Sequence, residues 1–233
     1  MIPLKNDFTV AGKSAVVLLS GGLDSAVALA WAVKTYGLTK VHALSVDYGQ
    51  RNVRELKSAI AIAKMFKISH RISAVRLDLG GELVSGTPSE LSKRTKTSPA
   101  AVPARNSILL SMAAGYAATV GADVLVIGAC ATDAANFPDC TFSFLEKLEK
   151  AISTGLGEHI YICAPLLSLS KEEIVNMAKV TDRAWDAVKL SWSCYKDGDA
   201  PCGSCSACSF RSEGFIKAQS ADPASDTVLT LEA

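Results

Sequence analysis

Residues 16–27 read VVLLSGGLDSAV and join an apolar run to a glycine turn and an alanine-rich segment. The apolar run predicts a buried strand at residues 14–20, and the alanine-rich continuation predicts a helix at residues 24–36 that ends at Gly37. The free N–H groups and the partial positive charge at the start of a helix face such a turn. The stretch therefore predicts an anion-binding strand–turn–helix unit.

The same alternation continues along the chain. Further strands are expected at residues 41–46, 70–75, 124–127 and 160–163, and further helices at residues 52–66, 106–120, 139–154, 170–179 and 209–219. The helix at 106–120 is apolar nearly all round, which predicts that it is buried. This order indicates an α/β fold with an open, mainly parallel sheet flanked by helices. In such a fold ligands bind at the carboxyl ends of the strands.

Three polar loops are expected at that edge of the sheet, at residues 20–25, 47–52 and 128–139. We expect them to converge on one crevice. Residues 79–103 are rich in Gly, Ser, Thr and Pro and are too long for an ordinary connection, which indicates an active-site loop. The sequence Ser170-Lys171-Glu172-Glu173 is a capping-box pattern for the helix that follows.

The bulk composition excludes several classes of protein. The chain has 233 residues with 24 Lys and Arg against 23 Asp and Glu, a net charge of +1, so coating nucleic acid is not its main task. Apolar residues make up 49%, which is consistent with one sizeable core around a sheet buried on both faces. No apolar run approaches the roughly 20 residues of a membrane span, and residues 1–13 lack an apolar signal segment, so we expect a cytoplasmic protein.

The glycine turn is unusual for a phosphate loop, because it has no lysine and carries Asp24 where a phosphate would sit. Gly21 and Gly22 allow the backbone to approach an anion, and the hydroxyls of Ser20 and Ser25 add donors. Asp24 would repel a phosphate unless a divalent cation lay between them, so we expect Mg²⁺ with a nucleotide. The simpler alternative is an aspartate that caps the helix.

Four of the seven cysteines gather within fifteen residues, at Cys194, Cys202, Cys205 and Cys208. Two consecutive C-x-x-C turns bring three thiolates to one point, and a fourth completes a tetrahedron. Four thiolates leave no open position, which favours structural Zn²⁺ over an iron–sulfur cluster or disulfides. A nucleic-acid-binding zinc ribbon is disfavoured because the flanking residues SFRSEGF are not strongly basic.

The segment SGGLDS resembles the pyrophosphate loop of the ATP-pyrophosphatase (PP-loop) superfamily, whose members typically activate an oxygen of the substrate by adenylation. Further motifs follow in order: YGQR at 48–51, VPARN at 102–106, FPDC at 137–140, APLLSLSKEEIV at 164–175 and SCY…CGSCSACSFRSEGF from 193 to 215. Together they resemble the 7-cyano-7-deazaguanine (preQ0) synthase family. That resemblance implies an adenine nucleotide alpha hydrolase-like fold and ATP-dependent conversion of 7-carboxy-7-deazaguanine and ammonia to the nitrile, through an activated carboxylate and an amide.

The resemblance also implies roles for individual residues. ATP would be bound by Ser20, Gly21, Gly22, Leu23, Asp24, Ser25 and Arg51. The substrate would be bound by Arg105, Asn106, Asp133, Phe137 and Asp139, and catalysis would involve Asp24, Lys171 and Arg105. Simpler alternatives stay open: Lys171 as a solvated lysine in its capping box, the arginines as surface ion pairs, and Asp133 or Asp139 as helix caps.

The chain departs from the family pattern at three matched motifs. Asn52 follows YGQR where the family has His, Ala104 replaces a glycine, and Thr141 replaces an arginine next to a Tyr-to-Phe change at Phe137. An arginine replaced by threonine is not conservative. A divergent ligase that stops at the amide, or that transfers the acyl group to another amine such as one on a protein, is therefore an alternative. A non-catalytic nucleotide-binding module is the second.

The expected organisation is a PP-loop ATP-binding domain at residues 1–190, a zinc-binding subdomain at 191–219 and a polar tail at 220–233, in which TVLTL could form a short edge strand. Expected partners are ATP, ammonia and the deazaguanine carboxylate, and the resemblance suggests a homodimer. Direct binding of nucleic acid and of membranes is not expected.

Overall fold

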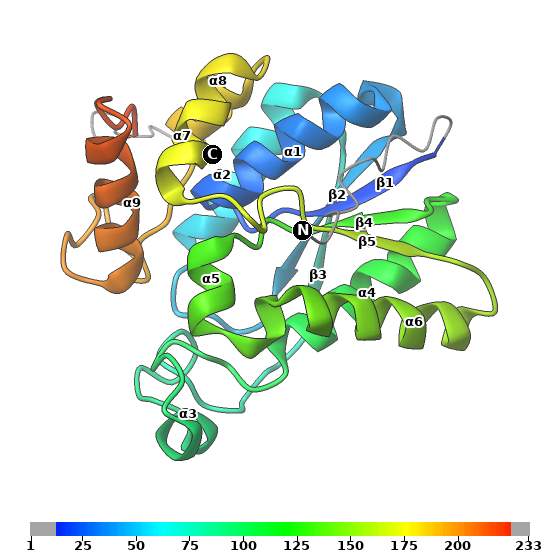
Figure 1. Ribbon diagram of the computed structural model, residues 1–233, viewed down its shortest axis with the longest axis horizontal. Coiled ribbons are helices and arrows are strands. Elements are labelled where there is room, and N and C mark those ends of the chain that lie inside the picture. The colour runs from blue at the N-terminus through cyan, green and yellow to red at the C-terminus, as the bar shows by residue number, and fades with distance from the viewer. Residues whose placement is uncertain (1–12, 225–233) are drawn as a thin grey trace.

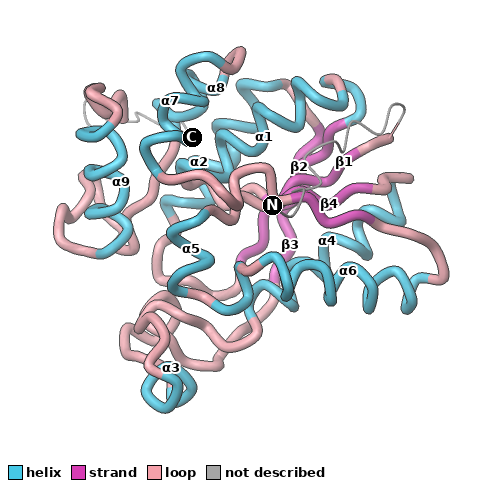
Figure 2. The backbone as a smooth tube through the Cα atoms, viewed as in Figure 1, coloured by secondary structure: helices cyan, strands magenta, loops and turns pink. Residues whose placement is uncertain are grey.

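A computed structural model describes residues 13–224. Within them, the strands form one sheet in the order β3-β2-β1-β4-β5, and every pair of neighbours is parallel (Figures 1 and 2). The bounds are Ala15–Leu18 (β1), Val41–Asp47 (β2), Ser69–Ala74 (β3), Val124–Val126 (β4) and Tyr161–Cys163 (β5). The predicted parallel α/β sheet is confirmed. The strand order reverses at β1, which lies between β2 and β4, and such a reversal is where open α/β sheets bind ligands.

The predicted helices are present with shifted ends, and three short ones were not predicted. The predicted set is α1 (Leu23–Tyr36), α2 (Arg54–Phe66), α4 (Arg105–Val120), α6 (Phe142–Leu156), α7 (Lys171–Val180) and α9 (Ser206–Lys217). The additional α-helices are α3 (Glu90–Thr95), α5 (Ala131–Asn136) and α8 (Ala184–Leu190), with short 3₁₀ turns at Leu38–Lys40 and Pro138–Cys140.

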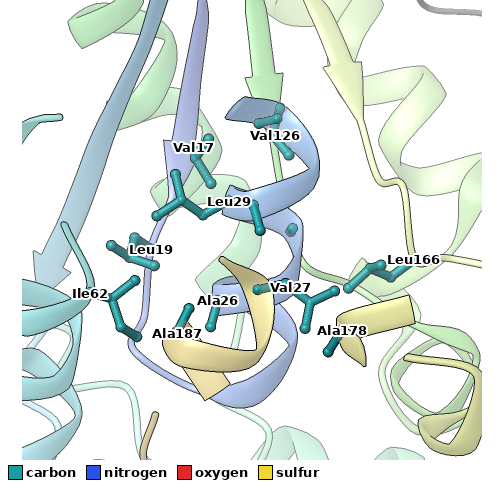
Figure 3. Close-up of a cluster of buried hydrophobic side chains, with 14 of the residues drawn as sticks. Val17, Leu19, Ala26, Val27, Leu29, Ile62, Val126, Leu166, Ala178 and Ala187 are labelled. Atoms are coloured by element: carbon teal, nitrogen blue, oxygen red, sulfur yellow. The ribbon is translucent and has the colours of Figure 1, made fainter. Parts of the chain in front are cut away.

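The two faces of the sheet carry different helices (Figure 1). Alternate residues of β1 divide between two apolar clusters: Val17 packs with α1, α2, α7 and α8, and Val16 packs with α4 and α6. Figure 3 shows the first cluster, in which Leu29 of α1 and Ile62 of α2 are fully buried. Each such aliphatic side chain contributes about 1.5–3 kcal/mol of hydrophobic stabilisation relative to an exposed position.

The prediction that residues 106–120 form a helix buried all round is wrong in part. In α4 one stripe is buried, including Leu110, Ala113 and Ala117, whereas Ser111 and Ala118 on the opposite side are exposed. Helix α4 is an outer layer on one face of the sheet. Its outer side carries small residues such as Gly115 and Thr119, which do not require burial.

The predicted start of a helix at Asp139 is also wrong. Residues Pro138–Cys140 form a 3₁₀ turn, and α6 begins only after Thr141, whose hydroxyl accepts the backbone N–H of Phe144 at 3.4 Å. The proposed edge strand TVLTL lies outside the described residues. None of the helices within residues 13–224 has the length and apolar character needed to cross a membrane.

Candidate active site

A cavity of about 250 Å³ opens at the carboxyl ends of β1, β2 and β4, where the strand order reverses. All three loops predicted to converge contribute to its wall, through residues such as Ser20, Tyr48 and Gly128. Leu83, from the long segment 79–103, lines the cavity as well. The expected crevice is therefore present, and the long segment reaches it.

The glycine turn is held by its own serines. The Ser25 hydroxyl accepts the N–H of Gly21 at 3.1 Å and donates to the carbonyl oxygen of Gly22 at 3.0 Å. The Ser20 hydroxyl accepts the N–H of Gly22 at 3.2 Å and donates to the Ser25 oxygen at 3.1 Å. The N–H of Leu23 donates to the Ser193 hydroxyl at 3.4 Å. Three consecutive N–H groups thus point at hydroxyl oxygens, in the arrangement that an anion would use.

Two glycines permit close approach of elements around this turn. Gly21 has φ +98°, and a β-carbon there would lie 2.1 Å from the carbonyl oxygen of Glu55 on α2. A β-carbon on Gly128, after β4, would lie 2.9 Å from the backbone nitrogen of Ser25. Neither position accommodates a side chain, so both glycines set the distance between the turn and its neighbouring elements.

Asp24 and Lys171 form an ion pair at the base of the cavity. The Lys171 Nζ donates to Asp24 Oδ2 at 2.6 Å, and the lysine side chain is 12% exposed. Burial acts to lower the pKa of Lys171, but Asp24 and Asp133 hold that pKa above its ordinary value. The simpler interpretation of Lys171 as a solvated lysine is wrong, although the predicted capping box between Ser170 and Glu173 is confirmed.

A group of candidate metal ligands surrounds this pair. One ligand atom each from Asp24, Cys130 and Asp133 lies within 4.8 Å of the others. Burial raises the pKa of Asp133, and the neighbouring Asp24 raises it further. The other oxygen of Asp24, Oδ1, is buried without a hydrogen-bond partner among the described residues. Two crowded carboxyl groups and an unsatisfied oxygen fit a divalent cation such as Mg²⁺.

Arg105 begins α4 and lines the opposite part of the cavity beside Tyr48. Burial acts to lower the pKa of Arg105, but the neighbouring Tyr48 and Asp139 raise it, so the guanidinium stays charged. The backbone N–H of Asn106 donates to Asp139 Oδ2 at 3.2 Å, and the Asn106 amide donates to the Asp139 carbonyl oxygen at 3.2 Å. Asp139 thus fastens the first turn of α4.

The structure separates the predicted site residues into two groups. The cavity wall includes Ser20, Gly22, Leu23, Asp24, Ser25, Arg105, Asn106, Asp133, Phe137 and Lys171. Gly21, Arg51 and Asp139 do not belong to that wall. Arg51 is exposed, and its guanidinium lies against Gly86 of the long segment. Asp133 combines both alternatives considered for it, since it lines the cavity and its Oδ2 accepts the N–H of Cys130 at 3.2 Å at the start of α5.

Several residues of the wall were given no role from the sequence. Tyr48, Ser193, Tyr195 and Arg211 lie in the quoted motifs, whereas Glu55 lies outside them. A signal for Glu55 was present, because Asn52 and Glu55 have the spacing of a capping box. The Asn52 oxygen does accept the N–H of Glu55 at 3.2 Å, but the Glu55 side chain faces the cavity.

The four clustered cysteines meet as predicted. Their sulfur atoms lie within 4.8 Å of one another, so this group could hold a metal ion. The backbone N–H groups of Lys196 and Cys202 donate to the Cys194 sulfur at 3.4 and 3.3 Å. N–H donors aimed at sulfur favour the thiolate form, which is the form that binds Zn²⁺.

Residues next to this cysteine cluster contact the glycine turn of the cavity. The N–H of Trp192 donates to the carbonyl oxygen of Gly21 at 2.9 Å, and Ser193 accepts the N–H of Leu23. Arg211 of α9 donates to the Ser193 hydroxyl at 3.0 Å and is itself paired with Asp222 at 2.6 Å. Residues 192–193, directly before the first cysteine, therefore contact the glycine turn at Gly21 and Leu23.

Comparison with known proteins agrees with this arrangement. The family model of the queuosine biosynthesis protein QueC matches residues 14–219. The 7-cyano-7-deazaguanine synthase of Thermoplasma volcanium is 40% identical over 221 residues, 91% of this chain and 90% of that protein. The enzyme of the same name from Acetivibrio thermocellus is 40% identical over 216 residues, 88% of this chain and 94% of that protein.

Among solved structures, a predicted subunit of a tRNA methyltransferase from Methanocaldococcus jannaschii has a TM-score of 0.51 at 19% identity, covering 71% of this chain and 75% of that one. At that identity the similarity describes the fold alone. The family match spans the sheet, the phosphate loop, Lys171 and the cysteine cluster. The chain is therefore an enzyme, and it belongs to the queuosine biosynthesis protein QueC family.

Proposed function

We propose that this enzyme converts 7-carboxy-7-deazaguanine, ammonia and ATP to 7-cyano-7-deazaguanine. The observation that carries the proposal is a single cavity that joins an anion-binding turn, with Asp24 and Lys171, to a wall that holds a charged arginine and Phe137. Activation of a carboxylate by ATP requires both halves in one chamber, because the reacting oxygen must lie beside a phosphate.

The phosphate loop would bind the nucleotide. The N–H groups of Gly22 and Leu23 point at serine hydroxyls that a phosphate oxygen could replace as acceptor. Asp24 and Asp133 would hold Mg²⁺, which neutralises phosphate charge when bound. Lys171, kept protonated beside them, would supply a fixed positive charge where pyrophosphate departs.

The opposite wall would bind the deazaguanine carboxylate. The Arg105 guanidinium is a planar, permanently charged donor suited to a carboxylate. Phe137 provides an apolar surface for the flat ring. Asn106 supports this wall indirectly, since its amide already donates to the Asp139 carbonyl oxygen and to the Cys140 sulfur.

The reaction would proceed in two activations. ATP first converts the carboxylate to an acyl adenylate, and ammonia displaces the nucleotide to give the amide. A second ATP then adenylates the amide oxygen, with release of pyrophosphate and one N–H proton, and loss of AMP together with the remaining N–H proton gives the nitrile. In both rounds the enzyme makes a poor oxygen leaving group depart, which suits a loop that binds the departing phosphates.

The test is mass spectrometry of one reaction mixture that contains the purified protein, ATP, Mg²⁺, ammonium and 7-carboxy-7-deazaguanine. The nitrile, formed with AMP and pyrophosphate, is the expected product. Amide alone, or a deazaguanine mass added to a protein amine, would replace the proposal with the divergent ligase. No consumption of ATP that depends on the carboxylate would refute both.

Thr141 is one of the departures from the family pattern that suggested a divergent ligase. It does not belong to the cavity wall, and its hydroxyl donates to the Pro138 carbonyl oxygen at 2.9 Å at the start of α6. Thr141 itself therefore contributes no group to the wall. The homodimer and the structural role of zinc stay predictions, tested by light scattering and by elemental analysis of the purified protein.

A further inference from the structure

The Glu55 side chain places a carboxyl group beside the phosphate loop. The reaction steps described above do not use this carboxyl group. Glu55 lies in the first turn of α2 and lines the cavity close to Ser20. A β-carbon built on Gly22 would lie 3.6 Å from Glu55 Oε1. The carboxyl group therefore lies beside Gly22, within the cavity.

Glu55 is separate from the other two acids of the wall. Asp24 and Asp133 gather around Lys171 and form the candidate cation group, to which Glu55 does not belong. The groups that face Glu55 are the Ser20 hydroxyl from the loop after β1, the Tyr48 phenol after β2 and the Arg105 guanidinium from α4. It therefore adjoins the substrate wall.

The surroundings leave Glu55 able to exchange a proton near neutral pH. Burial raises the pKa of Glu55 to about 7, while the nearby Ser20 hydroxyl and the charge of Arg105 act to lower it. An acid with a pKa close to the working pH both accepts and releases protons readily.

Other ionisable groups of the wall are less suited to accept a proton. Burial raises the pKa of the Cys140 thiol to about 12 and raises the pKa of Tyr48, so both stay protonated. Lys171 stays charged in its ion pair. Within residues 13–224, no histidine lines the cavity.

We propose that Glu55 is the proton acceptor for the ammonia that attacks the activated carboxyl group, an inference that rests on the proposed function. Nitrogen forms a bond to the carbonyl carbon, and the carbon–oxygen bond to AMP breaks with its electron pair on the departing phosphate. One proton passes from nitrogen to the Glu55 carboxylate, which gives the amide, AMP and neutral Glu55. Loss of that proton to solvent restores the carboxylate.

The experiment separates activation from amide formation. Exchange of labelled pyrophosphate into ATP, dependent on 7-carboxy-7-deazaguanine, reports activation, and rapid quench with ammonium reports formation of the amide. We expect Glu55→Gln to keep exchange within about threefold of wild type and to lose amide formation by at least about 100-fold. Glu55→Asp retains a carboxylate and should recover at least about tenfold of that loss. Glu158→Gln, at an exposed glutamate, is the matched control.

The pH dependence of amide formation distinguishes a proton acceptor from a structural residue, because a purely structural Glu55 would not affect it. At constant free ammonia, the wild-type rate of amide formation should fall about tenfold per pH unit below pH about 7, because the carboxylate becomes protonated. Glu55→Gln should lack this limb.

Two results would overturn the assignment. One is a Glu55→Gln enzyme that forms amide at the wild-type rate. The other is an equal loss of exchange and amide formation with a raised KM for ATP, which would make Glu55 a support of the phosphate loop. If wild type shows no exchange that depends on the carboxylate, the proposed function fails, and the inference fails with it.

Discussion

At the scale of single residues, Ala104 occupies a backbone position that a β-carbon tolerates poorly. It precedes α4 with φ +56° and ψ +17°, in the left-handed region. That conformation costs a non-glycine residue about 1–2 kcal/mol. The matched motif of the family has glycine here. The alanine at position 104 therefore introduces backbone strain next to Arg105, but it does not change a side chain of the cavity.

We expect Ala104→Gly to raise the free energy of unfolding by about 0.5–1 kcal/mol, since relief of strain exceeds the added entropy of the unfolded chain. Thermal and urea denaturation measure the change. Ala118→Gly, on the exposed side of the same helix, should instead lower the free energy of unfolding by about 0.5–1 kcal/mol. Equal losses in both variants would show that the left-handed conformation of Ala104 is not strained.

Lys171 supports a second prediction at this scale. Lys171→Met would leave Asp24 and Asp133 without their shared cation, so the two carboxylates would repel each other and the phosphates. We expect kcat/KM for ATP to fall at least about 100-fold, a loss of about 2.7 kcal/mol in transition-state binding. Steady-state kinetics measure it, with Lys34→Met at an exposed lysine of α1 as control.

The contrary outcome for Lys171 is a loss of folding stability with unchanged kcat/KM, which would make the ion pair purely structural. Asp24 and Lys171 were both predicted as site residues from the sequence. Their contact was not predicted, because 147 positions separate them along the chain. Local patterns name Asp24 and Lys171 as candidates. Only the packing of α7 against α1 brings the lysine to the aspartate.

At the scale of elements, long periodic segments were predictable and short ones were not. Helices α1, α2 and α7 were expected within two residues of their ends, because their apolar spacing extends over several turns. Helices α3 and α5 have six residues and α8 has seven, too few to show a helical period. The start of α6 was misplaced because Pro138 and Asp139, usual residues of a helix start, belong instead to a preceding 3₁₀ turn.

Thr141 marks the true start of α6 and gives the element-scale prediction. We expect Thr141→Ala to lower the free energy of unfolding by about 1 kcal/mol, because the cap on the Phe144 N–H is lost. The rate of nitrile formation should stay within about twofold of wild type, since Thr141 lies outside the cavity wall.

Thr119→Ala, an exposed threonine near the end of α4, serves as the control for Thr141, and denaturation and product formation are measured on both. Thr141→Arg, which restores the family residue, should not increase product formation. A large gain in product formation with arginine would mean that this loop reaches the substrate. The replacement of the family's arginine by threonine would then affect function.

At the scale of the whole molecule, the cysteine cluster and the phosphate loop form one connected structure. Asn52 illustrates the connection, because its amide donates to the Cys194 carbonyl oxygen at 2.6 Å while its oxygen accepts the N–H of Glu55. A residue that departs from the family pattern thus joins the start of α2 to the cysteine segment. The spacing of the cysteines predicts a metal site, but spacing carries no information on which distant loop that site supports.

The last prediction concerns the Zn²⁺ that the cysteine cluster is expected to hold. We expect chelation of the purified protein to lower its affinity for ATP about tenfold, or about 1.4 kcal/mol, because residues 192–193 would lose the anchor that holds them against Gly21 and Leu23. Calorimetric titration with ATP and Mg²⁺, together with elemental analysis for zinc, measures both quantities, and added Zn²⁺ should restore affinity.

Ser193→Ala tests the same connection without removing the metal. It deletes the acceptor of the Leu23 N–H and the hydroxyl that Arg211 holds, and it leaves the four cysteines in place. We expect this variant to keep its zinc and to lose a few-fold in affinity for ATP. Chelation should then weaken ATP binding by less in Ser193→Ala than in wild type, because the two changes interrupt one path and are not additive. Full additivity, or undiminished ATP binding by the metal-free protein, would show that the cluster supports another part of the molecule.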